Sequence, residues 1–176
     1  MENSSTYFLH PSGSFTKPSF MMEDEMGNPV YEGNMTKQSL LGATTFEFIN
    51  HKTGRSQEHK VGHTITQETH GGFRPSILDV LSVKSHFKFD GVKIWDYLHE
   101  QGIRIDSHIA TDKLGMKYEV SLKGQPMALI ATAPPKGGKG IFTTGVTYHV
   151  TTEDENLDLA FLTAFAIART EQAFYN

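Results

Sequence analysis

The chain has 176 residues, a length typical of one domain that can bury a hydrophobic core. Its 38% hydrophobic content and 12 Phe exclude a disordered chain, and its net charge of −4 argues against a general nucleic-acid binder. The absence of cysteine excludes disulfides, thiolate nucleophiles and cysteine-ligated zinc. We therefore expect a single domain over 1–176. Its first residues carry no secretory signal pattern, which favours a cytoplasmic location.

The acidic residues are concentrated in two short segments. Seven of the 20 acids are Glu23, Asp24, Glu25, Glu153, Asp154, Glu155 and Asp158. The other 13 acids are outnumbered by 16 lysines and arginines, so the rest of the chain carries a net charge of +3. A locally basic face is therefore compatible with an acidic protein.

Short segments with alternating apolar and polar residues follow one another along the chain. Turn signals such as Gly27-Asn28, Thr53-Gly54, Asp90-Gly91 and Lys123-Gly124 separate them. The alternating apolar positions include Phe46 and Phe48; Val83, Phe87 and Phe89; Ile103, Ile105 and Ile109; and Phe142, Val146, Tyr148 and Val150. Many short half-buried strands predict a mainly β domain, either a sandwich or a barrel.

One mid-chain segment, 90–102, departs from this alternation and predicts a short helix. Asp90 is a candidate N-cap, and Gly102 is a candidate C-terminal stop. Ile94, Trp95 and Leu98 are the residues expected to face the core.

The segment Leu157–Ala168 predicts a second helix, over about 153–171. Thr152 and Glu155 have the spacing of a capping box, and the nearby acids suit the positive end of the helix dipole. The apolar residues cover every side of the helix except at Asp158 and Thr163, so the helix must be surrounded. The run is too short to span a bilayer, which needs about 20 apolar residues. We therefore predict that the strands wrap around this helix.

Two hairpin segments precede this helix along the chain. The segment Ser19–Tyr31 contains an aromatic strand, an Asp-x-x-Gly-Asn turn and a Val-Tyr strand, and it resembles the opening hairpin of the LURP-one-related family. Phe48–Gly54 is similar to the next hairpin, with Asn50 where an aspartate is common. The resemblance implies the tubby-like fold that phospholipid scramblases are thought to share. In that fold, a closed antiparallel β-barrel of about 12 strands surrounds a central hydrophobic C-terminal helix.

Histidines are the first candidates for a functional site. His59 and His63 have the spacing of a zinc pair on a helix. However, their segment has the pattern of a strand, in which two such rings start roughly 13 Å apart. We therefore predict surface or half-buried histidines and no metal site.

Lysines are the second candidates, because converging cations can hold a phosphate group. Lys84 and Lys88 lie on the polar face of a predicted strand, and Lys136 and Lys139 lie in a glycine-rich loop. The alternative interpretations are a solvated strand face and a simple connecting loop.

No catalytic constellation is present, since the chain lacks a Gly-x-Ser-x-Gly elbow and an obviously inward-facing carboxylate pair. We therefore expect no enzyme and no cofactor. The leading hypothesis is a binding or scaffold module for anionic lipid headgroups or phosphorylated ligands, peripheral at a membrane. This follows the resemblance, because tubby domains bind phosphoinositides. The alternatives are a protein-interaction domain without a small ligand and, less favoured, a small-molecule carrier.

Overall fold

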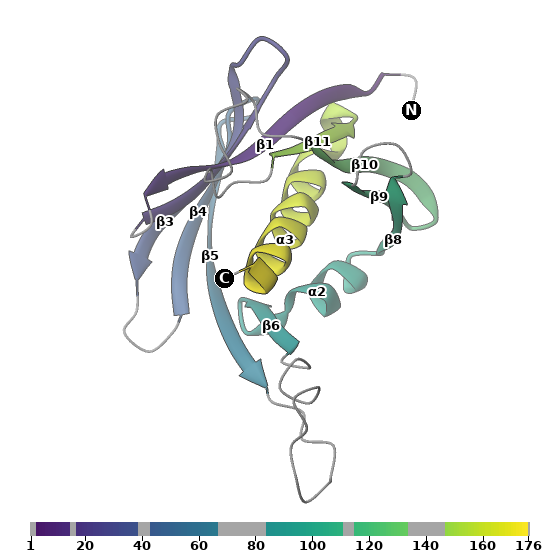
Figure 1. Cartoon of the computed structure of the whole chain (residues 1–176). Coiled ribbons are helices and arrows are strands. Elements are labelled where there is room, and N and C mark those ends of the chain that lie inside the picture. The colour runs from purple at the N-terminus through teal and green to yellow at the C-terminus, as the bar shows by residue number, and fades with distance from the viewer. Residues whose placement is uncertain are drawn as a thin grey trace, which may run out of the picture.

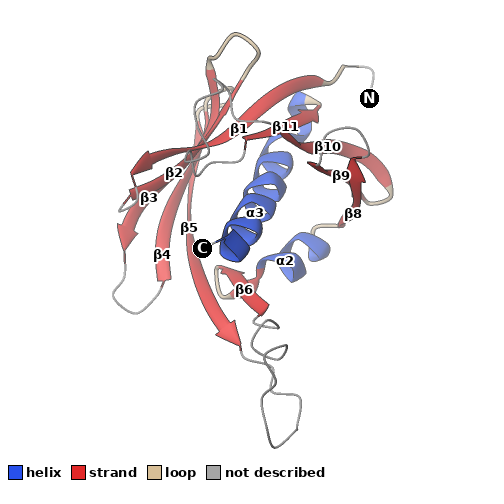
Figure 2. Cartoon of the chain, in the orientation of Figure 1, coloured by secondary structure: helices blue, strands red, loops and turns tan. Residues whose placement is uncertain are grey.

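The computed structural model describes residues 3–14, 17–38, 43–66, 84–110, 115–133 and 147–175. In these ranges the chain forms one large antiparallel sheet and two α-helices, which confirms the mainly β prediction (Figures 1 and 2). The strands are β1 (Ser5–Ser14), β2 (Lys17–Glu23), β3 (Pro29–Gln38), β4 (Ala43–Asn50), β5 (Arg55–Thr66), β6 (Lys84–Phe89), β7 (Val92–Lys93), β8 (Ile103–Ala110), β9 (Gly115–Leu122), β10 (Gln125–Ala133) and β11 (Thr147–Thr152). The helices are α2 (Ile94–Glu100), the 3-10 turn η1 (Asp154–Asn156) and α3 (Leu157–Tyr175).

The sheet curves around α3, with β1–β5 on one side of the helix and β8–β10 on the other (Figure 1). Its strand order is β7-β6-β5-β4-β3-β2-β1-β11-β10-β9-β8, so the first and last strands of the chain are neighbours. In this order β7 and β8 stand at opposite ends. The helix α2, which follows β7 and precedes β8, contacts β6, β7, β8 and α3. We call this junction between the two ends of the sheet the seam.

The tight hairpins form where the sequence carries Asp-Gly and Lys-Gly pairs. Asp90 and Gly91 have φ values of 50° and 86°, and Lys123 and Gly124 have values of 50° and 83°. Each pair connects two residues that lie directly opposite each other on neighbouring antiparallel strands. Positive φ at both central residues is the requirement of a type I′ hairpin, whose twist matches that of the strands.

Asp24 organises the turn between β2 and β3 through its side chain. Its carboxylate accepts hydrogen bonds from the backbone N–H of Met26 (2.9 Å) and of Asn28 (2.8 Å), and from the Asn28 side chain (3.0 Å). These hydrogen bonds, the Asn28 side chain first, hold the pKa of Asp24 below its usual value. The Asp-x-x-Gly-Asn pattern is therefore explained by local turn chemistry.

Over 157–168, where its side chains are described, α3 is buried on nearly all sides, as its sequence pattern predicts. Its buried residues are Leu157, Ala160, Phe161, Thr163, Ala164, Phe165, Ala166, Ile167 and Ala168. The hydroxyl of Thr163 donates to the Leu159 carbonyl (2.7 Å), so this polar group is satisfied within the helix. Among the described residues, neither helix is long and apolar enough to cross a membrane.

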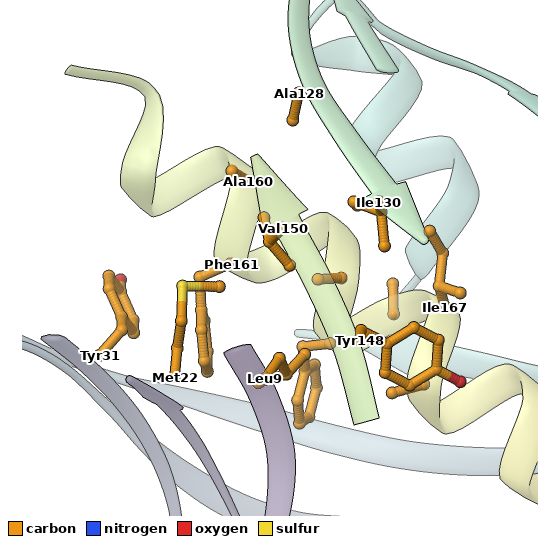
Figure 3. Packing of buried hydrophobic residues seen from close by; sticks show 14 of the residues in the cluster. Leu9, Met22, Tyr31, Ala128, Ile130, Tyr148, Val150, Ala160, Phe161 and Ile167 are labelled. Atoms are coloured by element: carbon orange, nitrogen blue, oxygen red, sulfur yellow. The ribbon is translucent and has the colours of Figure 1, made fainter. Parts of the chain in front are cut away.

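Aromatic rings from the sheet pack directly against α3 (Figure 3). The Tyr31 and Phe161 rings stack with centroids 4.1 Å apart, and Phe165 meets Phe48 edge-on at 5.2 Å. Aliphatic residues such as Ile130, on the other side of the helix, are also fully buried. Side chains therefore fill the interior of the sheet.

Gly33 on β3 allows the closest approach of the sheet to the aromatic core. A Cβ atom at this position would lie 3.0 Å from Cε1 of Phe48 and 3.3 Å from Cζ of Phe161. Both distances are shorter than ordinary van der Waals contact, so the packing here depends on the missing side chain.

The predicted start of the C-terminal helix was wrong. Thr152 is fully buried, and its hydroxyl donates to the Met127 carbonyl (2.9 Å) on β10 and does not accept a capping hydrogen bond from the first turn of the helix. The chain instead passes through η1, whose N-cap residue Glu153 makes no side-chain capping bond, and α3 begins at Leu157. A buried hydroxyl group needs a hydrogen-bond partner, and for Thr152 this partner is a backbone carbonyl of the neighbouring strand β10.

Two details of the short helix were also wrong. Asp90 is not its N-cap, because it occupies the β6–β7 turn and the helix begins only at Ile94. Trp95 is 41% exposed, whereas Ile94 and Leu98 are buried. Residues four apart share a helix face, while the next residue is rotated by about 100°, so burial of this pair turns Trp95 outward. The stop at Gly102 is confirmed, with a φ of 87°.

Candidate functional site

The structure places the predicted cationic residues unevenly. Lys84 and Lys88 lie on β6, at positions opposite Thr66 and Gly62 of β5. Lys136 and Lys139 lie outside the described residues. A third lysine, Lys93 of β7, is exposed and stands directly opposite Lys88. We call Lys84, Lys88 and Lys93 the cationic hairpin.

The sequence pattern did not indicate Lys93, because its strand has only two residues and was assigned to the predicted helix. An Asp-Gly pair is typical of a two-residue hairpin turn. Placing Asp90 and Gly91 in such a turn would have predicted that Lys93 pairs with Lys88.

Asp90 fixes the cationic hairpin to β5. Its carboxylate accepts a hydrogen bond from the Lys60 backbone N–H (2.7 Å) and lies 2.7 Å from Nδ1 of His59. Its own backbone N–H donates to the Lys60 carbonyl (2.7 Å). The ring of His59 also lies 5.5 Å from that of Phe48, between centroids. The hairpin is thus held to β5 by three polar contacts of Asp90, and His59 extends this link to the core through its contact with Phe48.

The histidine pair His59 and His63 lies on β5, so the strand interpretation of this segment is confirmed. Over the ranges that the structure describes, no group of three or more His, Asp or Glu side chains is arranged to hold a metal ion.

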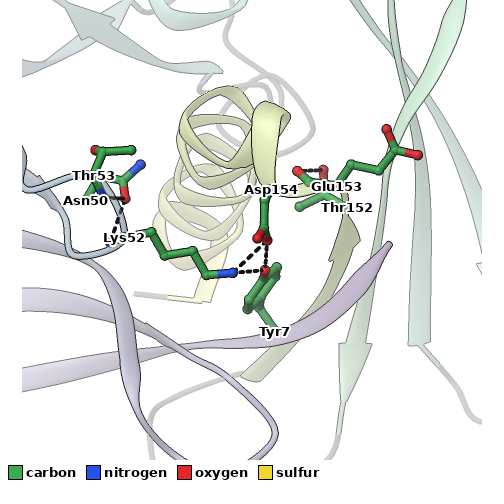
Figure 4. Close-up of polar contacts among 7 residues, drawn as sticks. All are labelled: Tyr7, Asn50, Lys52, Thr53, Thr152, Glu153 and Asp154. Carbon is green, nitrogen blue, oxygen red and sulfur yellow. Dashed lines mark hydrogen bonds and ion pairs between the residues drawn. The ribbon is translucent and has the colours of Figure 1, made fainter. Parts of the chain in front are cut away.

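A second polar cluster lies where the chain enters α3, and it consists of Tyr7, Lys52 and Asp154 (Figure 4). The Lys52 ammonium donates to the Asp154 carboxylate (2.6 Å) and to the Tyr7 hydroxyl (2.8 Å), and the Tyr7 hydroxyl donates to Asp154. Tyr7 is buried, whereas the Lys52 and Asp154 side chains are 36% and 62% exposed. We call these three residues the helix-entrance cluster.

The charges of the helix-entrance cluster stabilise each other. The hydrogen bond from Lys52, and then that from Tyr7, holds the pKa of Asp154 below its usual value. Desolvation opposes the charge of Lys52, but the hydrogen bonds to Asp154 and Tyr7 outweigh it and raise the pKa of Lys52. Lys52 therefore stays protonated at neutral pH, which is the wrong state for a nucleophile.

Asn50, beside this cluster, links the β4–β5 turn to α3. Its side-chain carbonyl accepts from the backbone N–H of Lys52 (3.0 Å) and of Thr53 (3.2 Å), and its amide donates to Asp158 (2.9 Å). Burial raises the pKa of the Tyr31 hydroxyl, and the neighbouring Asp158 carboxylate raises it further. Asn50 supplies a donor that an aspartate lacks, which suits its acidic partner.

The two polar regions therefore differ in whether their polar groups bond one another or are candidates to bind a ligand. The helix-entrance cluster is internally satisfied and ties three segments of the chain together. The cationic hairpin carries like charges at adjacent positions, and it is the candidate binding site. Comparison with models of protein families, with curated proteins and with solved structures finds no match to this chain.

Proposed function

We propose that this chain is a non-enzymatic binding or scaffold domain that recognises anionic lipid headgroups or phosphorylated ligands through the cationic hairpin. The observation that carries the proposal is the position of Lys93 directly opposite Lys88 on paired strands. Two lysines at paired backbone positions suit a phosphate group with several acceptor oxygens.

The packed interior supports recognition on the outer surface. Phe161 and Phe165 of α3 are 1% and 0% exposed, and aromatic rings of the sheet surround them. A carrier of small apolar molecules needs an internal cavity of several hundred Å³. Side chains occupy the space where such a cavity would form, which favours a surface binder over a carrier.

The separation of charge along β5 reconciles anion binding with a net charge of −4. The acidic turn at Asp24 precedes β3, and β5 follows the β4–β5 turn. The His51 backbone N–H in that turn donates to the Val30 carbonyl at the start of β3, so both turns lie at the same end of the sheet. The other acidic segment is held at the same end by the contact of Asp154 with the β4–β5 turn.

The lysines lie toward the opposite end of β5. Lys88 is opposite Gly62, which is seven residues beyond Arg55, or roughly 23 Å along the strand, and Lys84 is opposite Thr66, farther still. The shorter distance is about three times the Debye length of about 8 Å at physiological ionic strength. The acidic end therefore does little to repel an anion at the cationic hairpin.

The tubby-like relationship is part of the same proposal. In it, the sheet is a barrel whose seam is covered by α2, with α3 as the central helix, and the domain attaches peripherally to a membrane. Its support is the order of two hairpins and a buried terminal helix along the chain.

Vesicle co-sedimentation tests the proposal. The protein should sediment with phosphatidylcholine vesicles that contain phosphatidylserine, less so as salt rises, and not with phosphatidylcholine alone. Lys84→Glu/Lys88→Glu should reduce binding, whereas Arg55→Glu, at the far end of β5, should not. Titration with a soluble polyphosphate distinguishes a free phosphorylated ligand from a membrane. Background-level binding in both assays at low salt refutes the proposal.

A protein-interaction domain is the second candidate, and β8 favours it. This strand ends the sheet order, and among the described strands it pairs only with β9. Such an edge can accept a strand from another chain, although its exposed Arg104, Asp106 and His108 limit unspecific pairing. A concentration-dependent mass in light scattering, or a partner recovered by pull-down, would support this candidate.

A further inference from the structure

Two apolar side chains are exposed beside the cationic hairpin. Among the described residues, Met26, Val92 and Trp95 are the exposed large hydrophobic side chains. Val92 and Trp95 are 38% and 41% exposed and flank the exposed Lys93 within four residues of sequence. Apolar exposure and positive charge therefore coincide at the seam.

The surrounding core holds Trp95 in this outward position. Ile94 and Leu98 of the same helix are 0% and 1% exposed, so the orientation of α2 is set by its buried side. Rotation of the helix to bury Trp95 would expose both aliphatic residues. The exposure of Trp95 is thus a fixed feature of the packing, which reduces the entropy that a contact would cost.

This combination fits the interface of a lipid bilayer. Tryptophan favours the headgroup region because its ring is apolar and its N–H is polar. Lysines beside it add attraction to anionic lipids. The opposing groups are Asp96 and Glu100 on α2, which are both exposed, and Asp90, which is bonded to β5. Two partly exposed apolar residues fall far short of the roughly 1,000 Å² of a stable protein interface, which favours a membrane over a protein partner.

We infer that the seam is a membrane-docking surface, in which Trp95 and Val92 enter the interfacial layer of an anionic bilayer while Lys93 contacts the headgroups. This inference rests on the proposed function and adds the element that penetrates the membrane. It also sets the orientation, with the acidic end of the sheet directed away from the lipid.

The chain provides its own probe, because Trp95 is its single tryptophan. On addition of vesicles that contain phosphatidylserine, the Trp95 emission should shift to shorter wavelength, and lipids with brominated acyl chains should quench it. Neither change should occur with phosphatidylcholine alone, and high salt should reverse both changes.

Variants test the two parts of the surface. Trp95→Ala should lower the vesicle partition coefficient roughly five- to tenfold, and Lys93→Glu should lower it roughly tenfold. Matched controls at the acidic end, Met26→Ala and Arg55→Glu, should leave it unchanged. Far-UV circular dichroism and thermal unfolding verify that each variant is folded.

The outcomes separate the inference from the proposed function. Co-sedimentation with unchanged Trp95 emission would overturn the inference while the proposed lipid binding stands. An equal loss of binding in Met26→Ala and Trp95→Ala would also overturn it. Background-level sedimentation of the wild-type protein at low salt would overturn both the inference and lipid recognition.

Discussion

Gly33→Ala tests the contact between the sheet and the central helix through the sign of its effect. At a strand position with open space, replacing glycine with alanine stabilises a protein by roughly 0.5–1 kcal/mol. At Gly33 the new methyl group would lie 3.0 Å from Phe48 and 3.3 Å from Phe161, so two packed rings must move. Overpacking of this kind typically costs about 1–3 kcal/mol. The contact outweighs the entropic gain, and we expect net destabilisation of about 1–2 kcal/mol.

Urea denaturation followed by circular dichroism measures this difference, and the melting temperature should fall by roughly 2–8 °C. Combining the change with Phe48→Leu, which removes the closest ring, should make the alanine less costly than it is in the wild-type background. An increase in stability on Gly33→Ala would mean that β3 does not press against α3, and the enclosed-helix arrangement would be refuted.

Three further predictions concern the helix and its entrance. Phe165→Asp should prevent folding because it buries an unpaired charge, while Phe165→Leu should fold; soluble, cooperatively unfolding Phe165→Asp would contradict the burial of α3. Asn50→Asp should cost about 1.5–3 kcal/mol, since it removes the donor to Asp158, and adding Asp158→Asn should restore most of that loss in urea denaturation. Lys52→Met should cost at most about 1 kcal/mol, because the ion pair is largely solvated. This cost should be greatest at neutral pH: it should vanish as pH falls below 3.8 through the lowered pKa of Asp154, and as pH rises above 10.5 through the raised pKa of Lys52. A cost that does not vary with pH would show that the charges are not coupled.

Local periodicity was enough to predict the buried helix and the strands that contain Phe46 and Tyr148, whereas the predicted strand residues Val83, Phe142 and Val146 lie outside the described residues. Phe46 and Phe48 alternate with polar residues and are buried, and the same is true of Tyr148 and Val150. The circumferential apolar pattern of α3 indicated its burial within the protein, because a helix that is apolar on all sides and too short to span a bilayer must be enclosed by the chain itself. These features depend on residues close together in sequence.

Features that depend on distant partners could not be predicted. Thr152 matches a capping box in sequence, but its hydroxyl donates a hydrogen bond to the Met127 carbonyl on a neighbouring strand. Trp95 was expected in the core because hydrophobicity alone does not tell which side of a two-turn helix is enclosed. The link between Lys52 and Asp154 spans 102 residues, so no local signal announces it.

The site was predicted only in part. Lys84 and Lys88 were selected from the alternation of one strand, and the structure adds Lys93 opposite Lys88. Lys136 and Lys139 stay predictions, since they lie outside the described residues. The identity of a ligand depends on the surface shape and on the partner, and the chain's composition does not encode it directly.

The pairing of the first strand with the last has a consequence for biosynthesis. Leu9 pairs with Tyr148, 139 residues later, and the helix that fills the interior follows after that. At translation rates of about 5–20 residues per second, β1 waits roughly 7–28 s for its partner to leave the ribosome. During this interval the nascent sheet has neither its central ladder nor its core. The core therefore cannot assemble until β11 and α3 have both been synthesised, and the earlier strands stay exposed to aggregation until then.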